Sequence, residues 1–175
     1  MALGAEVELR RGNTIRSLPL EAFYLGYMKN ALQPGEFVQA LQVPRRAGCA
    51  QQVLAYKISK RYDSDISAVC MALAIELDGE RVGAVRIACG GMAAIVKRAA
   101  QTEAALLGQP WTVATLQAAQ AALALDYQPL SDMRASAAYR LQVAQNLLRR
   151  AWLETRATDP LPPSATTVWA REETA

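Results

Sequence analysis

The architecture of this chain is indicated most clearly by residues 66–89, which read ISAVCMALAIELDGERVGAVRIAC. Large apolar side chains occupy every second position from Val69 to Leu77, and small side chains fill alternate positions at Ala68, Cys70, Ala72 and Ala74. This alternation predicts a strand over 66–77 that is covered on both faces, most simply by helices packing close against the small side chains. Asp78-Gly79 is a strong hairpin signal, so we expect residues 81–89 to return antiparallel, before Gly90-Gly91 ends the sheet.

The segments around this hairpin predict one more strand and a set of helices. Residues 53–58 read as a short strand, and the polar residues 59–65 read as a loop. Further along the chain, apolar residues recur at the spacing of a helix, and we expect helices over 95–107, 113–125 and 136–156. Gly108 and Pro110 stop the first helix, and Thr112 and Ser136 are placed to cap the other two. Strands followed by helices indicate an α+β fold, an antiparallel sheet of about three strands packed against about three helices.

Residues 1–44 predict a smaller unit that precedes this domain. Apolar and polar residues alternate over 5–10, and an extended pattern resumes over 14–18 after Gly12-Asn13, which predicts a hairpin with one buried face. Residues 20–28 show helical spacing and 37–43 read as extended, whereas 45–51 lack periodicity and are expected to be a linker. We therefore expect a unit over 1–44, a domain over 52–156 and a flexible tail over 157–175. Pro160, Pro162 and Pro163 forbid further helix, so residues 164–175 are expected to be extended or disordered.

Composition excludes several kinds of site. The 175 residues are 52% hydrophobic and 20% charged, as in a globular protein, and only 6% are aromatic. A net charge of +3 with so few aromatic side chains argues against nucleic acid as a partner. The chain has no histidine, which excludes Ser-His-Asp and Cys-His catalysis. Cys49, Cys70 and Cys89 are too scattered to indicate a metal site.

The cysteines, the N-terminus and the lengths of the apolar runs indicate the cellular compartment of the protein. Three isolated cysteines suit a reducing compartment better than a disulfide framework. The N-terminus lacks the basic start and apolar core of a signal peptide, and no apolar run approaches the roughly 20 residues that span a bilayer. We therefore expect a cytoplasmic protein with no membrane partner.

Three groups of residues are candidates for chemistry. The densest polar cluster comprises Lys57, Ser59, Lys60, Arg61, Asp63, Ser64 and Asp65. A rigid scaffold would aim this cluster at a polar or anionic ligand, although a solvated loop with weak ion pairs is the alternative that composition alone favours. Gly90-Gly91 matches no phosphate-binding motif and reads as a plain turn. The residues around the start of the last helix are interpreted as specifying the fold, with Arg140 anchoring the loop after Leu125: Asp132, Arg134, Ser136, Tyr139 and Arg140.

Several of these stretches resemble one known family. The segments LGA (3–5), LPL (18–20), PGE (34–36) and VP (43–44), with Phe23 and Tyr27, look like the end of the FAD-binding domain of molybdenum hydroxylases. The segments YKISKRYDSDI (56–66), GGMA (90–93) and DMRASAAYR (132–140) look like the C-terminal domain of their flavoprotein subunits, as in CO dehydrogenase. The resemblance covers about residues 3–156, and it is closest to the FAD-binding small subunits of bacterial xanthine dehydrogenases.

The resemblance implies an electron-transfer role. In that family a molybdenum cofactor in a large partner subunit oxidises a purine, and electrons pass through 2Fe-2S clusters to FAD and then to NAD. The matching positions imply that Lys57 and Val38 contact FAD, and that the loop holding Arg61 and Asp65 lies by the flavin ring and the NAD approach. Ser64 departs from relatives that carry Asp at this position. No catalytic or metal-ligating residue is assigned in this chain.

The resemblance also implies that the chain corresponds to the C-terminal portion of such a subunit. The glycine-rich and cysteine motifs of the family lie upstream of the residue matching Leu3. We therefore expect the chain alone to bind FAD weakly or not at all. The alternative is a non-catalytic α+β interaction module that has lost FAD binding, and the sequence encoded upstream of Met1 distinguishes the two hypotheses.

Overall fold

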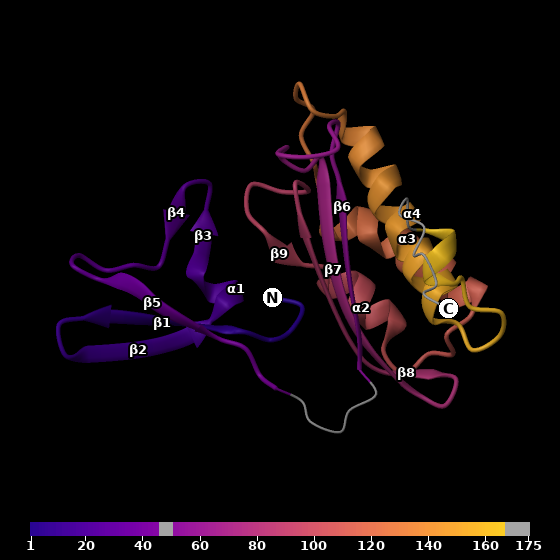
Figure 1. The fold of residues 1–175 in the computed structure, drawn as a ribbon, viewed down its shortest axis with the longest axis horizontal. Helices are drawn as coiled ribbons and strands as arrows, with labels where there is room; N and C mark the ends of the chain where they lie inside the picture. Colours follow the sequence, from indigo (N-terminus) through magenta and orange to yellow (C-terminus); the bar gives the residue numbers. More distant parts are fainter. Residues whose placement is uncertain (46–50, 167–175) are drawn as a thin grey trace, which may run out of the picture.

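The computed structural model describes residues 1–45 and 51–166, which form two lobes. We call residues 1–45 the N-terminal lobe and residues 51–166 the C-terminal lobe. In Figure 1 the N-terminal lobe lies on one side of the C-terminal sheet, and the long helices lie on the other side. Most of the expected linker, including Cys49, and the end of the expected tail lie outside the described residues.

The N-terminal lobe is built on a three-stranded antiparallel sheet. β1 (Glu6–Arg11) lies in the middle and pairs with β2 (Thr14–Pro19) and with β5 (Phe37–Gln42). Val7 and Leu9 of β1 are buried against Phe23, so the predicted hairpin with one buried face is confirmed. This small core holds the lobe together.

The prediction of a helix over 20–28 is wrong for most of this segment. α1 spans only Leu20–Phe23, and β3 (Tyr24–Gly26) and β4 (Lys29–Asn30) form a small hairpin after it. The backbone of Met28 has a φ of +54°, which reverses the chain, and the amide of Ala31 donates to the carbonyl of Phe23 at 2.9 Å. Tyr27 is therefore exposed at the tip of a hairpin instead of lying on a helix face.

The C-terminal sheet has the strand order β6-β7-β8-β9 and is antiparallel throughout. Its strands are β6 (Gln52–Ile58), β7 (Val69–Asp78), β8 (Arg81–Gly90) and β9 (Lys97–Arg98). Asp78 pairs with Arg81, so Gly79 and Glu80 form the turn of the predicted hairpin, and Gly79 has the positive φ of +59° that such a turn requires. The hairpin is confirmed, with β7 beginning at Val69 and not at residue 66.

Three helices cover one face of this sheet. They are α2 (Ala100–Leu106), α3 (Val113–Asp126) and α4 (Ala137–Thr155). The hydroxyls of Thr112 and Ser136 accept the capping hydrogen bonds from Thr115 and Tyr139, as predicted. The core between sheet and helices includes the fully buried Met71, Leu73, Ile75, Ile87, Leu123 and Leu148.

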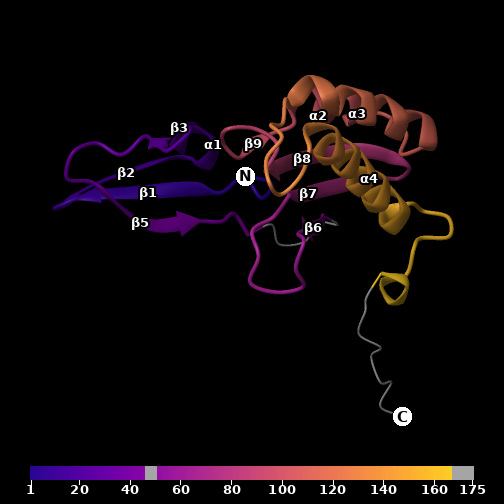
Figure 2. The same cartoon turned by 90° about the horizontal axis from the view of Figure 1, so that it is seen from above.

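The other face of the sheet differs from the prediction. We expected helices on both sides of β7, but α2, α3 and α4 all lie on the face of the large side chains (Figure 2). The face of the small side chains is turned toward the side where the N-terminal lobe lies (Figure 1), and Cys70 on it is exposed. Small side chains therefore do not mark close helix packing here.

Two further segments depart from the predicted pattern. The helix expected over 95–107 begins only at Ala100, because Lys97 and Arg98 pair with β8 and the amide of Ala99 donates to Ile87. The segment 164–175, expected to be extended or disordered, begins within a single 3-10 turn, η1 (Pro163–Ala165), since proline is tolerated at the first position of a helix. No helix within the described ranges is long and apolar enough to cross a membrane.

Candidate functional site

Three loops meet at one end of the C-terminal sheet. They are residues 59–68 between β6 and β7, residues 91–96 between β8 and β9, and residues 130–136 before α4. We call them the loop cluster. The first and third lie together at the top of Figure 1.

Arg140 joins these three loops. It lies in the first turn of α4 and is 3% exposed. Its guanidinium donates to the carbonyl of Ala68, to the carbonyl of Gly91 at 2.9 Å and to Asp132 Oδ1 at 2.6 Å. One acceptor comes from each loop, so the proposed anchoring role of Arg140 is confirmed and extends beyond the loop after Leu125.

Asp132 organises the third loop. It accepts the backbone N–H groups of Arg134 at 2.8 Å and Ala135 at 3.1 Å, besides the guanidinium of Arg140. These hydrogen bonds, that from the Arg134 backbone first, lower the pKa of Asp132 from 3.8 to about 2.

The lowered pKa of Asp132 predicts acid sensitivity. The pKa of Asp132 is lower in the folded than in the unfolded chain. The ionised carboxylate therefore stabilises the folded chain above pH 3.8, and this stabilisation is lost as the pH falls toward 2. We expect Asp132→Asn to lower the free energy of unfolding at pH 7, and the difference from the parent chain to shrink between pH 4 and pH 2. Urea unfolding at several pH values measures this. Asp159→Asn is the control, since Asp159 pairs with Arg156 on the surface and its side chain is 88% exposed. A difference that stays constant with pH would contradict the prediction.

Asp65 organises the first loop. It accepts the backbone N–H groups of Lys60 and Arg61 at 3.1 and 3.0 Å and that of Ile66 at 2.9 Å. Hydrogen bonds to the carboxylate, that from Arg61 first, lower the pKa of Asp65. Lys60 Nζ donates to the carbonyl of Met133 at 2.6 Å, which ties this loop to the third one. Residues 59–65 of the polar cluster therefore form an ordered loop, while Lys57 lies on β6.

A cleft of about 610 Å³ lies beside the loop cluster. Its floor consists of small residues from the ends of β7 and β8 and the loop that follows, namely Cys70, Gly90, Gly91, Ala93 and Ala94. Tyr27 of the β3–β4 hairpin, 74% exposed, lines it from the N-terminal lobe. Arg134, Arg140 and Asp132 line its edge, and Asp132 pairs with both arginines. A floor of small residues with an aromatic side chain from the other lobe suits a flat ligand.

The structure places the predicted cofactor-binding residues unequally around this cleft. Lys57 on β6 stands opposite Cys70 in the sheet, so its side chain leaves on the same face as the floor. Arg61 and Asp65 line an adjoining cavity of about 360 Å³ together with Arg134. Val38 lies on β5 in the other lobe, is 44% exposed and does not line the cleft. Contact of these four residues with a cofactor stays a prediction.

Sequence reasoning missed three residues of the cleft. The sequence pattern predicts a helix at Tyr27, a strand face covered by helices at Cys70 and a plain turn at Gly91, whereas all three residues line the cleft. Gly91 has a φ of +78°, and a Cβ at this position would lie 2.4 Å from the carbonyl oxygen of Ala68. The glycine pair signals this role, because its second member has to be glycine for the loops to meet.

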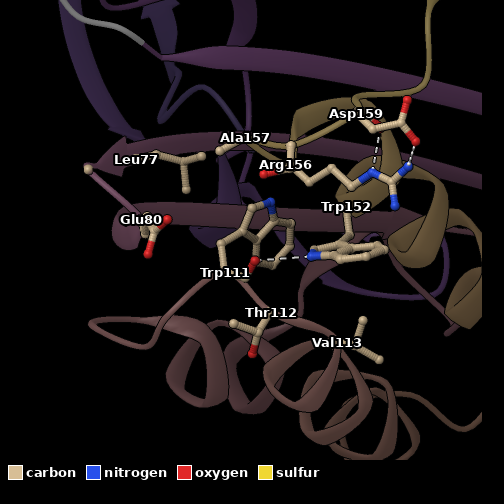
Figure 3. A pocket seen from close by; sticks show the side chains of 11 residues that line it. Leu77, Glu80, Trp111, Thr112, Val113, Trp152, Arg156, Ala157 and Asp159 are labelled. Atoms are coloured by element: carbon tan, nitrogen blue, oxygen red, sulfur yellow. Dashed lines mark hydrogen bonds and ion pairs between the residues drawn. The ribbon is translucent and has the colours of Figure 1, made fainter.

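A second cavity, of about 440 Å³, lies at the opposite end of the β7–β8 hairpin (Figure 3). Trp111 and Trp152 line it, and the indole of Trp152 donates to the carbonyl of Trp111 at 3.1 Å. Arg156 lies over the Trp152 ring, 5.2 Å from its centroid, and pairs with Asp159 at 2.8 Å. None of the predicted site residues lines this cavity.

Across the described residues, no three Cys, Asp or Glu side chains are grouped so that they could hold a metal ion.

Known proteins share both the fold and the sequence pattern. CO dehydrogenase from Hydrogenophaga pseudoflava superposes with a TM-score of 0.79 at 29% identity, covering 85% of this chain and 51% of that one. The carbon monoxide dehydrogenase medium chain of the same organism is 28% identical over 151 residues, which are 86% of this chain and 52% of the relative. Xanthine dehydrogenase from Emericella nidulans is 36% identical over 112 residues, which are 63% of this chain and 8% of the relative. The chain is thus similar to flavoprotein parts of molybdenum hydroxylases.

Two family descriptions match successive parts of the chain. Residues 1–46 match the FAD binding domain in molybdopterin dehydrogenase, and residues 54–155 match the CO dehydrogenase flavoprotein C-terminal domain. The chain belongs to the CO dehydrogenase flavoprotein C-terminal domain family. The resemblance seen in the sequence and the α+β fold class are both confirmed. The chain spans about half the length of the medium chain and a small part of the fungal xanthine dehydrogenase.

Proposed function

We propose that this chain forms the C-terminal side of a flavin site in a cytoplasmic molybdenum hydroxylase. It would take part in passing electrons from 2Fe-2S clusters through FAD to NAD, while a purine is hydroxylated at a molybdenum cofactor in a large partner subunit. The observation that carries this proposal is the cleft between Tyr27 and the small-residue floor. Family membership and the xanthine dehydrogenase relatives support it. In this proposal residues 1–44 are the end of the FAD-binding domain, 52–156 the C-terminal domain and 157–175 a flexible tail.

The residues present fit the flat ring of a flavin. When bound, FAD supplies a group that accepts and releases electrons. Cys70, Gly90 and Gly91 allow a ring to approach the sheet closely, and Tyr27 offers an aromatic face from the other lobe. Lys57 is expected to place a positive charge beside the floor, which favours a ligand that becomes more negative. Arg61 and Asp65 shape the adjoining loop, where we propose that NAD approaches.

This arrangement predicts weak flavin binding that depends on the ring. Because the contacts proposed here are all to the ring, we expect riboflavin, FMN and FAD to bind the 175-residue chain with similar dissociation constants of roughly 0.1–1 mM. Flavin fluorescence titration measures them. Tyr27→Ala should weaken binding by about 2- to 10-fold, since an aromatic pair contributes about 0.5–1.5 kcal/mol.

Leu25→Ala is the matched control for Tyr27→Ala. Leu25 is 65% exposed in the same hairpin and does not line the cleft, so this variant should leave the affinity unchanged. Absence of saturable binding, or equal affinities for Tyr27→Ala and the parent chain, would overturn the proposed ring site. Stoichiometric flavin that survives purification and desalting would contradict the expected weak binding.

The proposed partner is tested separately. A tagged copy of the chain, expressed in its native host, should co-purify with a large subunit that contains molybdenum, detected by metal analysis of the complex. Recovery of the chain without molybdenum or a large subunit would favour the non-catalytic interaction module.

A further inference from the structure

A charged cluster joins the two lobes on the same face of the sheet as the cleft. Within the described residues, Glu21 of α1 pairs with Arg86 of β8 at 2.5 Å and with Arg98 of β9 at 3.6 Å. Arg86 also donates to the carbonyl of Met1 at 3.4 Å. Both ion pairs therefore cross from the N-terminal lobe to the sheet.

The cluster is partly shielded from water. The side chains of Glu21, Arg86 and Arg98 are 26%, 30% and 31% exposed. Glu21 Oε2 is buried without a hydrogen-bond partner among the described residues, which is an unfavourable state for a carboxylate oxygen. Attraction between partly desolvated charges is stronger than between charges on an open surface. These ion pairs therefore help to hold the two lobes together.

Each side of the cluster is anchored in its own lobe. Arg98 bonds to Glu103, whose Oε1 also accepts the amide of Ile87 at 2.7 Å, so the sheet side is rigid. Glu21 lies two residues before Phe23, a core residue whose carbonyl accepts the amide of Ala31 just beyond the β3–β4 hairpin. A shift of Glu21 would therefore move the hairpin that carries Tyr27.

The charged cluster lies on the same strand and the same face of the sheet as the floor of the cleft. Arg86 precedes Gly90 by four residues on β8, so it lies roughly 13 Å along the strand from the floor and on the same face. Tyr27 and the floor belong to different lobes, so their separation depends on how the lobes are held. We propose that Glu21, through Arg86 and Arg98, is a positioning residue that fixes the width of the cleft. As far as flavin is concerned, this inference rests on the proposed function.

The width of the cleft can be measured without any flavin. One spin label is placed on Met28→Cys, next to Tyr27, and another on Arg149→Cys, which is exposed on α4, in a Cys49→Ser, Cys70→Ser background so that no label fills the cleft. Glu21→Gln should broaden and lengthen the distance distribution recorded by dipolar EPR. Glu36→Gln is the matched control, because Glu36 pairs with Arg16 at 2.8 Å inside the N-terminal lobe. Arg86→Met should reproduce the effect of Glu21→Gln, and the double variant should add little to either.

Riboflavin titration of unlabelled chains gives the second readout. If only about one Glu21→Gln molecule in ten keeps the cleft at the width of the parent chain, the apparent dissociation constant for riboflavin should rise about tenfold. Glu36→Gln should not change this constant. Equal distance distributions for Glu21→Gln and Glu36→Gln would overturn the inference. A widened cleft with unchanged riboflavin affinity would instead overturn the proposed function, because riboflavin would then bind outside this cleft. If the parent chain binds no riboflavin, the proposed function fails, and the EPR distances alone decide whether Glu21 fixes the width of the cleft.

Discussion

Gly91→Ala is expected to destabilise the chain by about 3 kcal/mol. Gly91 has a φ of +78°, a conformation that costs an L-residue about 1–2 kcal/mol. Its new methyl group would also lie 2.4 Å from the carbonyl oxygen of Ala68 and 3.1 Å from the guanidinium of Arg140. Relieving that overlap moves backbone in a packed site, which costs a further 1–3 kcal/mol or so. Urea unfolding monitored by circular dichroism measures the change.

Gly79→Ala separates the two causes. Gly79 has a φ of +59°, and a Cβ there meets nothing within 4 Å. This variant should therefore lose only the conformational part, about 1–2 kcal/mol. The excess loss in Gly91→Ala reports the overlap with Ala68. Equal losses in the two variants would show that the loops are not packed around Gly91 as described.

Arg140→Met is expected to cost at least about 3 kcal/mol. The variant keeps much of the aliphatic stem but removes the donor shared by the carbonyls of Ala68 and Gly91 and by Asp132. Leaving a buried acceptor without a donor costs about 1–3 kcal/mol, and Arg140 serves two carbonyl acceptors. Because one acceptor comes from each loop, the loss should be larger than that of a single hydrogen bond.

The effect of Arg140→Met should be concentrated in the loop cluster. Hydrogen exchange should accelerate most in residues 66–68, 91–93 and 130–135, while the core of α3 keeps its protection. Arg149→Met is the control, since Arg149 is exposed on the same helix. If both variants unfold at the same urea concentration, Arg140 does not hold the loops together.

The sequence predicted those elements whose pattern is local. The hairpin of β7 and β8 followed from alternation and from Asp78-Gly79, and α3 and α4 followed from apolar period and from the caps Thr112 and Ser136. The start of α2 was missed because Lys97 and Arg98 pair with β8, which is a contact across the sheet. The amide groups at the start of α2 bond to Asp126, 24 and 25 residues away, so no capping residue next to the helix marks its N-terminus.

The candidate site was predictable only in part. The polar loop of residues 59–65 stood out by composition, and the structure shows why it is ordered, through Asp65 and the hydrogen bond from Lys60 to Met133. Tyr27 was missed because its spacing with Leu20 and Phe23 suggested one helix face, whereas the φ of Met28 turns the chain at this point. The role of the small-residue face was also missed, because alternation indicates two different faces but not what covers each of them.

The sequence by itself determined the β7–β8 hairpin, the helices α3 and α4 and the absence of histidine side chains, since these depend on residue types and on spacing within one segment. Only the tertiary structure decided that the helices share one face, that Arg140 joins three loops and that Tyr27 lies across from Gly90 and Gly91. Glu21 and Arg86 are 65 residues apart, and Arg140 and Ala68 are 72 apart. Local periodicity carries no information about such partners, because chain topology brings them together.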